Sequence, residues 1–279
     1  MVAQLFSALV RALLVAVTVA LPSLMLTSPG APDSSQIVIL LAFVAGLLVF
    51  VEYNAASPSI LEFRFAAPYN RIKFSGVAIS VVMLSVIARN VSDPSSLAVL
   101  LADVGAAMRS ILDFPYSPVR LVILLTPPNS APAIAEFVGI AAALCYGISL
   151  LMVAIFVLIV RVLGWPVRRG AFNVWMNLPL FDPTGGGDVV QKLNREAGIN
   201  ISLGFVLPFL TPVLVSVLSW LFETGAVLDA KTLIWIICAW AFLPAGLVMR
   251  GVAMHRVAEL IIAKRRRVYA KAQDALQAI

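Results

Sequence analysis

The sequence predicts an all-α fold, a polytopic integral membrane bundle of six transmembrane helices followed by a basic C-terminal cytoplasmic helix. Of the 279 residues, 61% are apolar and 12% are charged, whereas a soluble domain is about 45–50% apolar and about 25% charged. The apolar residues form six long uncharged runs, and about 20 such residues cross a hydrocarbon core about 30 Å thick. The basic residues are concentrated in alternate connections between the runs, which predicts one orientation.

The six expected spans lie in a transmembrane domain that covers residues 1–255. They are residues 12–32, 34–51, 73–89, 136–161, 197–222 and 232–250. The third is the shortest, and the long side chains of Lys73 and Arg89 at its ends can extend toward the head groups. The first run could instead be a cleaved signal peptide. Arg11 would then leave a long leader, and no A-x-A site follows, so a retained span is favoured.

Residues 95–125 are expected to form an amphipathic segment on the periplasmic side. Apolar residues recur at helical spacing, but Asp103 and Arg109 interrupt them. Two charges at the bilayer centre cost about 5–7 kcal/mol, and the strong apolar residues of the segment return only about 2–5 kcal/mol. We therefore expect a surface helix over residues 95–112 rather than a seventh span. The sequence leaves open whether the segment lies flat at the interface or re-enters the bilayer.

The placement of basic residues predicts that both termini are cytoplasmic in a bacterial-type inner (plasma) membrane. Only four of the 20 lysines and arginines fall on the opposite side of the six-span arrangement: Arg89, Arg109, Arg120 and Lys231. Cytoplasmic connections carry the excess of Lys and Arg in membrane proteins. The connection over residues 162–196 is accordingly expected in the cytoplasm.

This cytoplasmic connection contains three glycines, Gly185 to Gly187, before Asp188. A phosphate-binding loop would need a following Gly-Lys-Ser/Thr, which is absent, so a turn before a capped helix is favoured. Asp188 can cap that helix with Gln191 as its reciprocal partner, and Gly198 is expected to end it. The other long connection, residues 52–73, mixes charged and aromatic residues, which favours the head-group layer over partner docking.

Residues 256–279 form a basic cytoplasmic tail with apolar residues at helical spacing. Its run of four cations, Lys264, Arg265, Arg266 and Arg267, favours contact with anionic head groups, at about 1 kcal/mol per basic residue near the surface. Docking of a protein partner is the alternative. Nucleic-acid binding is not expected, because no recognition module accompanies the basic run.

The residues available for chemistry are few, so neither catalysis nor a cofactor or metal site is expected. The chain has one histidine, His255, and its two cysteines, Cys145 and Cys238, lie inside apolar runs. A catalytic triad or a zinc site needs more than this. An integral-membrane enzyme would have to use connection carboxylates such as Asp182 and Asp188.

A solute site is a second hypothesis, based on the prolines of the last two spans. Backbone carbonyls near the middle of the membrane would be freed by Pro208, Pro212 and Pro244. Thr211 would add a hydroxyl there. Transporters place substrate sites at such interrupted helices, although prolines also merely kink membrane helices. No charged residue lies near the middle of any span, which argues against ion coupling.

Helix packing is the strongest pattern in the fourth span. Ala135, Gly139, Ala143 and Gly147 recur every four residues and predict a smooth face for a closely packed helix. A neighbouring span of the same chain is favoured as the packed helix, and a membrane-protein partner or a second copy in a homo-oligomer is the alternative. The favoured function is therefore a non-catalytic accessory, scaffold or assembly subunit of a membrane complex. A transporter or channel for a small neutral solute, using the kinked fifth and sixth spans, is the alternative.

Overall fold

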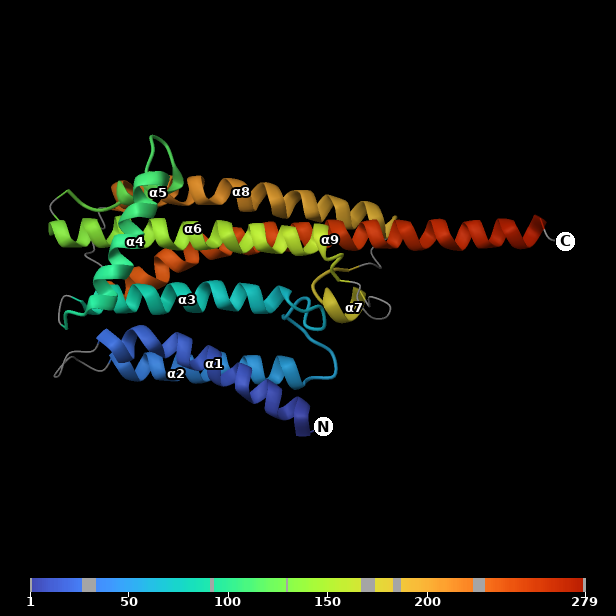
Figure 1. Ribbon diagram of the computed structural model, residues 1–279, viewed down its shortest axis with the longest axis horizontal. Coiled ribbons are helices and arrows are strands. Elements are labelled where there is room, and N and C mark those ends of the chain that lie inside the picture. Colours follow the sequence, from blue (N-terminus) through green and yellow to red (C-terminus); the bar gives the residue numbers. More distant parts are fainter. Residues whose placement is uncertain are drawn as a thin grey trace.

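The computed structural model describes residues 2–26, 34–90, 93–128, 130–166, 174–182, 187–222 and 229–277 (Figure 1). Within these residues every regular element is a helix. The helices are α1 (Val2–Leu26), α2 (Ser34–Asn54), α3 (Tyr69–Arg89), α4 (Ser96–Leu112), α5 (Pro118–Ile123), α6 (Pro132–Val162), α7 (Val174–Asn177), α8 (Val189–Phe222) and α9 (Ala230–Gln277).

Six of these helices, α1, α2, α3, α6, α8 and α9, are long and apolar enough to cross a membrane. The expectation of an all-helical chain with six such helices is therefore confirmed. They run along the long axis of the molecule and alternate in direction, so α1 begins and α9 leaves the bundle at the same end (Figure 1). We call this end the inner end and the opposite end the outer end.

The helix bounds differ from the expected spans. α8 begins at Val189 and passes through Gly198, so the expected helix end at Gly198 is wrong. A glycine ends a helix by adopting a positive φ, and Gly198 is not among the described residues with such a backbone. α9 continues from the sixth run into the tail without a break. α1 begins at Val2, before the expected span, and includes Arg11, whose guanidinium carbon lies 4.5 Å from the centre of the Tyr53 ring.

Some expectations fall on residues outside the described ranges. These are the end of the first expected span (27–32), part of the connection over 162–196 with most of its glycine run (167–173 and 183–186), and the last two residues of the tail.

The core is built around α9, which contacts α3, α6 and α8. The central part of α6, from Val138 to Cys145, is buried along its whole length. α8 and α9 approach closely at Gly204, where an added Cβ would lie 2.5 Å from the backbone oxygen of Pro244. Small residues permit such backbone approaches in membrane bundles.

α4 lies across the outer ends of α3 and α6 (Figure 1). It begins where the Ser95 hydroxyl oxygen accepts a hydrogen bond from the Ala98 N–H, at 3.2 Å. The expected helix at 95–112 is therefore present. Its contact with α6 is close at Gly105, where an added Cβ would lie 2.5 Å from Ile140.

Candidate functional site

A cavity of about 720 Å³ opens toward the inner end of the bundle. α9 contributes the largest share of its lining, and α8 contributes Asn200. The residues from α3 are Tyr69, Asn70, Lys73 and Val77. One end of the cavity is polar and the rest is apolar. Ligand cavities of about 300–1,000 Å³ with apolar walls and a few convergent polar groups are typical of binding sites, so this cavity is the candidate site.

The connection before α3 forms one wall of the polar end, and backbone contacts hold it in place. The Phe63 N–H donates to the Asn177 carbonyl at 2.7 Å, and the Phe65 N–H donates to the Asn177 side-chain oxygen at 3.2 Å. Phe63 is buried against Tyr69 and Trp165, with ring centroids 4.6 and 5.5 Å away. The Trp165 indole N–H donates to the Ala66 carbonyl at 3.1 Å. These contacts fix the backbone that carries Glu62.

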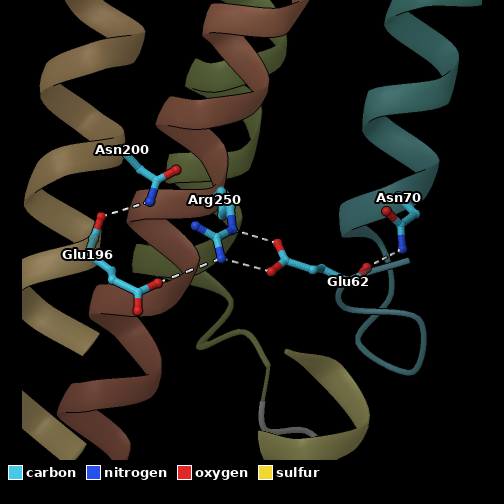
Figure 2. Close-up of polar contacts among 5 residues, drawn as sticks. All are labelled: Glu62, Asn70, Glu196, Asn200 and Arg250. Carbon is cyan, nitrogen blue, oxygen red and sulfur yellow. Dashed lines mark hydrogen bonds and ion pairs between the residues drawn. The ribbon is translucent and has the colours of Figure 1, made fainter. Parts of the chain in front are cut away.

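An ion pair between Glu62 and Arg250 joins this connection to α9 (Figure 2). Arg250 Nε and Nη2 donate to the two Glu62 carboxylate oxygens at 2.7 and 2.9 Å. The two side chains are 9% and 19% exposed. Glu196 of α8 lies on the other side of Arg250, at 3.7 Å and 38% exposed. Two-point pairing of this kind gives both strength and a fixed geometry.

Two asparagines bond to the backbone carbonyls of the two glutamates (Figure 2). Asn70 Nδ2 donates to the Glu62 carbonyl at 2.8 Å, and Asn200 Nδ2 donates to the Glu196 carbonyl at 2.7 Å. An amide NH₂ has two N–H groups and its oxygen accepts as well. Each asparagine therefore holds a backbone segment with one N–H and keeps further hydrogen-bonding capacity at the cavity.

Lys73 differs from the other charged residues of the cavity, Glu62 and Arg250, which are paired with each other. Its ammonium nitrogen lies 5.4 Å from the centre of the Tyr69 ring. Within the described part of the chain it makes no ion pair or hydrogen bond. Gly246 of α9 leaves room beside it, because an added Cβ there would lie 3.5 Å from Lys73 Cε and Nζ.

Charged residues of other elements lie at the same inner end. Arg64 donates to the carbonyl oxygens of Glu52 and of Ala55, the latter at 2.9 Å, and so caps the end of α2. The Glu52 carboxylate in turn accepts from the backbone N–H groups of Ser59, Ile60 and Leu61 at 3.1–3.3 Å. Burial lowers the pKa of the Arg64 guanidinium, whereas the nearby Glu52 charge raises it.

The structure places the predicted packing face under α4 of the same chain. An added Cβ at Gly139 would lie 2.7 Å from the Arg109 guanidinium, and one at Gly147 would overlap the end of Met108. Ala143 is fully buried and Ala135 half-buried. α4 therefore occupies the face that could also have seated a partner.

The predicted kink residues lie at the contact of α8 with α9, and none of them lines the cavity. The Pro208 carbonyl accepts from the Trp240 indole N–H at 3.0 Å. The Thr211 hydroxyl donates to the Leu207 carbonyl at 2.7 Å. Pro212 is buried, and the Pro244 carbonyl faces Gly204. The polar groups proposed for a solute are thus engaged within the chain.

The four basic residues of the tail, Lys264 to Arg267, lie on the exposed part of α9. Arg265 makes an ion pair with Asp188 at 2.8 Å. Asp188 also accepts from the Val190 N–H at 3.3 Å, at the start of α8. The hydrogen bond from Arg265 holds the pKa of the Asp188 carboxyl below its usual range.

Sequence reasoning missed the cavity and its ion pair. Glu62 and Arg250 are 188 residues apart, and nothing in their local patterns links them. The available signal was weaker: an arginine at the inner end of the sixth run and a glutamate just before the third. Within the described residues, no three His, Cys, Asp or Glu side chains are grouped as a metal site. The buried Cys145 and Cys238 sulfurs lie 3.8 Å apart.

Comparisons with known proteins found no matching family model, curated protein or solved structure.

Proposed function

We propose that the chain is a six-span protein of a bacterial-type inner membrane with both termini in the cytoplasm. We further propose that it is a non-catalytic accessory, scaffold or assembly subunit of a membrane complex. The orientation is supported by the excess of basic residues in the connections at the inner end. Partner binding is supported by one observation, the exposed basic end of α9.

The exposed end of α9 extends far beyond the bundle (Figure 1). Arg250 lies with Glu62 and Glu196 at the inner end, and Lys264 follows about 21 Å further along at 1.5 Å per residue. The head-group layer on each side of a bilayer is only about 5–8 Å thick. An upright α9 therefore carries Lys264 to Arg267 beyond the lipid head groups. This geometry supports an acidic protein surface as their partner, in preference to anionic lipid.

Solute transport draws less support from the contacts of α8 and α9. The Pro208 carbonyl and the Thr211 hydroxyl, which the transport hypothesis would use, make hydrogen bonds to Trp240 and Leu207. A solute would have to displace at least one of these bonds.

The test is gentle affinity purification of the full chain from native membranes, followed by lysine-directed cross-linking mass spectrometry. We expect a stoichiometric partner cross-linked at Lys264 or Lys271. A variant with Lys264, Arg265, Arg266 and Arg267 all replaced by Gln should lose it. Replacement of Lys231 by Gln, at the other end of α9, is the matched control. Recovery of the chain alone would contradict the proposal. If the four-Gln variant instead keeps the partner but loses binding to acidic vesicles, the tail contacts lipid.

A further inference from the structure

The cavity at the inner end has the polarity of an amphiphile. Its polar end carries Lys73, Asn70 and the paired Glu62 and Arg250, and its apolar wall includes Val77, Phe242 and Leu243. Along α9 the wall runs from Trp235 to Arg250, about 22 Å at 1.5 Å per residue. The cavity therefore offers polar groups at one end and a long apolar wall beside them.

Lys73 is the residue that selects the charge of the ligand. The negative charge of Glu62 attracts the Lys73 ammonium and the positive charge of Arg250 repels it. Glu62 is already paired with Arg250 by two hydrogen bonds. A half-buried ammonium without an acceptor loses solvation with little return. An anion placed next to it would compensate for the lost solvation through charge-assisted hydrogen bonds.

The cavity also offers further hydrogen-bond donors to such an anion. Asn70, on α3 with Lys73, uses one amide N–H for the Glu62 carbonyl and keeps another. Lys73 adds three N–H donors. A lysine ammonium is a common ligand of phosphate oxygens in proteins.

The apolar wall is open to the surroundings of the bundle rather than sealed within it. Leu243, in the middle of the wall, is 69% exposed, and Ala239 beside it is also exposed. For a membrane helix these surroundings are lipid. An acyl chain could therefore lie along the wall without first crossing the aqueous phase.

We propose that the cavity binds one acidic phospholipid of the inner leaflet, with its phosphate at Lys73 and an acyl chain along α9 between Trp235 and Leu247. The proposal requires the membrane location given above but not the protein partner. The lipid and the basic tail use separate residues, so either can fail without the other.

The test is native mass spectrometry of the purified full chain with added phosphatidylglycerol or phosphatidylethanolamine. We expect one phosphatidylglycerol to be retained in preference to phosphatidylethanolamine. Lys73→Gln should weaken its binding about five-fold, as one basic residue near a membrane surface contributes about 1 kcal/mol. Lys73→Arg should retain it. Lys231→Gln, which removes a cation at the outer end, is the matched control.

A second variant tests the apolar wall. In Ala239→Phe a larger side chain occupies the exposed wall without entering the buried core. This variant should weaken phosphatidylglycerol binding and leave the thermal unfolding temperature in detergent unchanged. Unchanged binding in both Lys73→Gln and Ala239→Phe would overturn the proposal. Equal retention of phosphatidylethanolamine would overturn the charge selectivity. Retention of oleate as strong as that of phosphatidylglycerol would overturn the phospholipid assignment.

Discussion

The two parts of α9 form one continuous helix in two different environments. From Ala230 to about Ile262, α9 packs against α3, α6 and α8, with residues such as Met249 and Met254 fully buried. From Ala263 onward its described side chains are exposed. The only ion pair of this exposed part within the described residues is that of Arg265 with Asp188.

The difference shows that one regular helix can be maintained by two kinds of force. The packed part contains Pro244 and two glycines, Gly246 and Gly251, which are poor helix formers, and its structure depends on packing against neighbours. The exposed part is rich in Ala, Lys, Arg and Gln, which have high intrinsic helix propensity. Substitutions in the packed part should therefore destabilise the fold much more than substitutions in the exposed part.

The largest effect is expected from Glu62→Gln, which removes one partner of a largely buried ion pair. Removal of one partner from a buried pair costs about 3–5 kcal/mol. Glu196 remains at 3.7 Å from Arg250, so we expect a loss of about 3 kcal/mol in the free energy of unfolding. Denaturant unfolding in detergent measures it.

Glu196→Gln is the control for this change. Its longer contact and greater exposure predict a loss of about 0.5 kcal/mol, since exposed pairs contribute about 0–1 kcal/mol. Equal losses for the two variants would show that the inner end does not depend on the Glu62 pair.

A smaller effect is expected from Gly204→Ala, at the close contact of α8 with α9. The added methyl would lie 2.5 Å from the Pro244 carbonyl oxygen and 2.6 Å from Val248. Overpacking costs about 1–3 kcal/mol, so we expect a loss of about 2 kcal/mol in thermal or denaturant unfolding.

Gly198→Ala, at the other of the two glycines of α8, is the matched control. An added Cβ at Gly198 has nothing within 4 Å, so the better helix propensity of alanine should raise stability by about 0.5–1 kcal/mol. Destabilisation by both variants would show that helix continuity, and not packing, limits this part of the bundle.

The smallest effect is expected in the exposed part, at Asp188 and Arg265. Because the pKa of Asp188 is lower in the folded chain than in the unfolded one, this pair favours the folded state above the unfolded pKa of about 3.9. That contribution is lost as the pH falls through the lowered pKa. Titration of the Asp188 carboxyl carbon by NMR should show a pKa below the usual range. Arg265→Gln should return it to that range, whereas Lys264→Gln should leave it lowered; an unchanged pKa in Arg265→Gln would mean that the pair does not form.

The number and type of the long helices could be predicted from the sequence, because a lipid solvent requires long apolar helices whatever their neighbours are. Their ends could not. Gly198 resembles a helix terminator locally, but α8 continues because nothing there requires a positive φ. The tail, residues 256–279, has no proline or glycine, and α9 continues into it without a break.

The candidate site could be predicted only in parts. The small residues at Gly139 and Gly147 indicated a close helix contact, but not that the cross-lying α4 would make it. The Glu62–Arg250 pair and the space beside Lys73 depend on how α3, α8 and α9 pack, which residue spacing along one chain does not encode. Pro212 has no N–H for the Pro208 carbonyl, but the Trp240 indole that bonds to this carbonyl lies on a different helix.

The buried aromatic group at the inner end gives the molecule an optical signature. Tyr69 and Trp165 are stacked with ring centroids 6.3 Å apart and planes at 23°, and Phe156 meets Trp165 edge-on at 5.1 Å. Aromatic rings held rigidly in an asymmetric core give near-ultraviolet circular dichroism, which disappears when fixed packing is lost although the helices persist. Together with the stacked Tyr146–Trp240 pair, this group lets the fixed packing of the bundle be followed spectroscopically through the chain's own side chains, without an attached label.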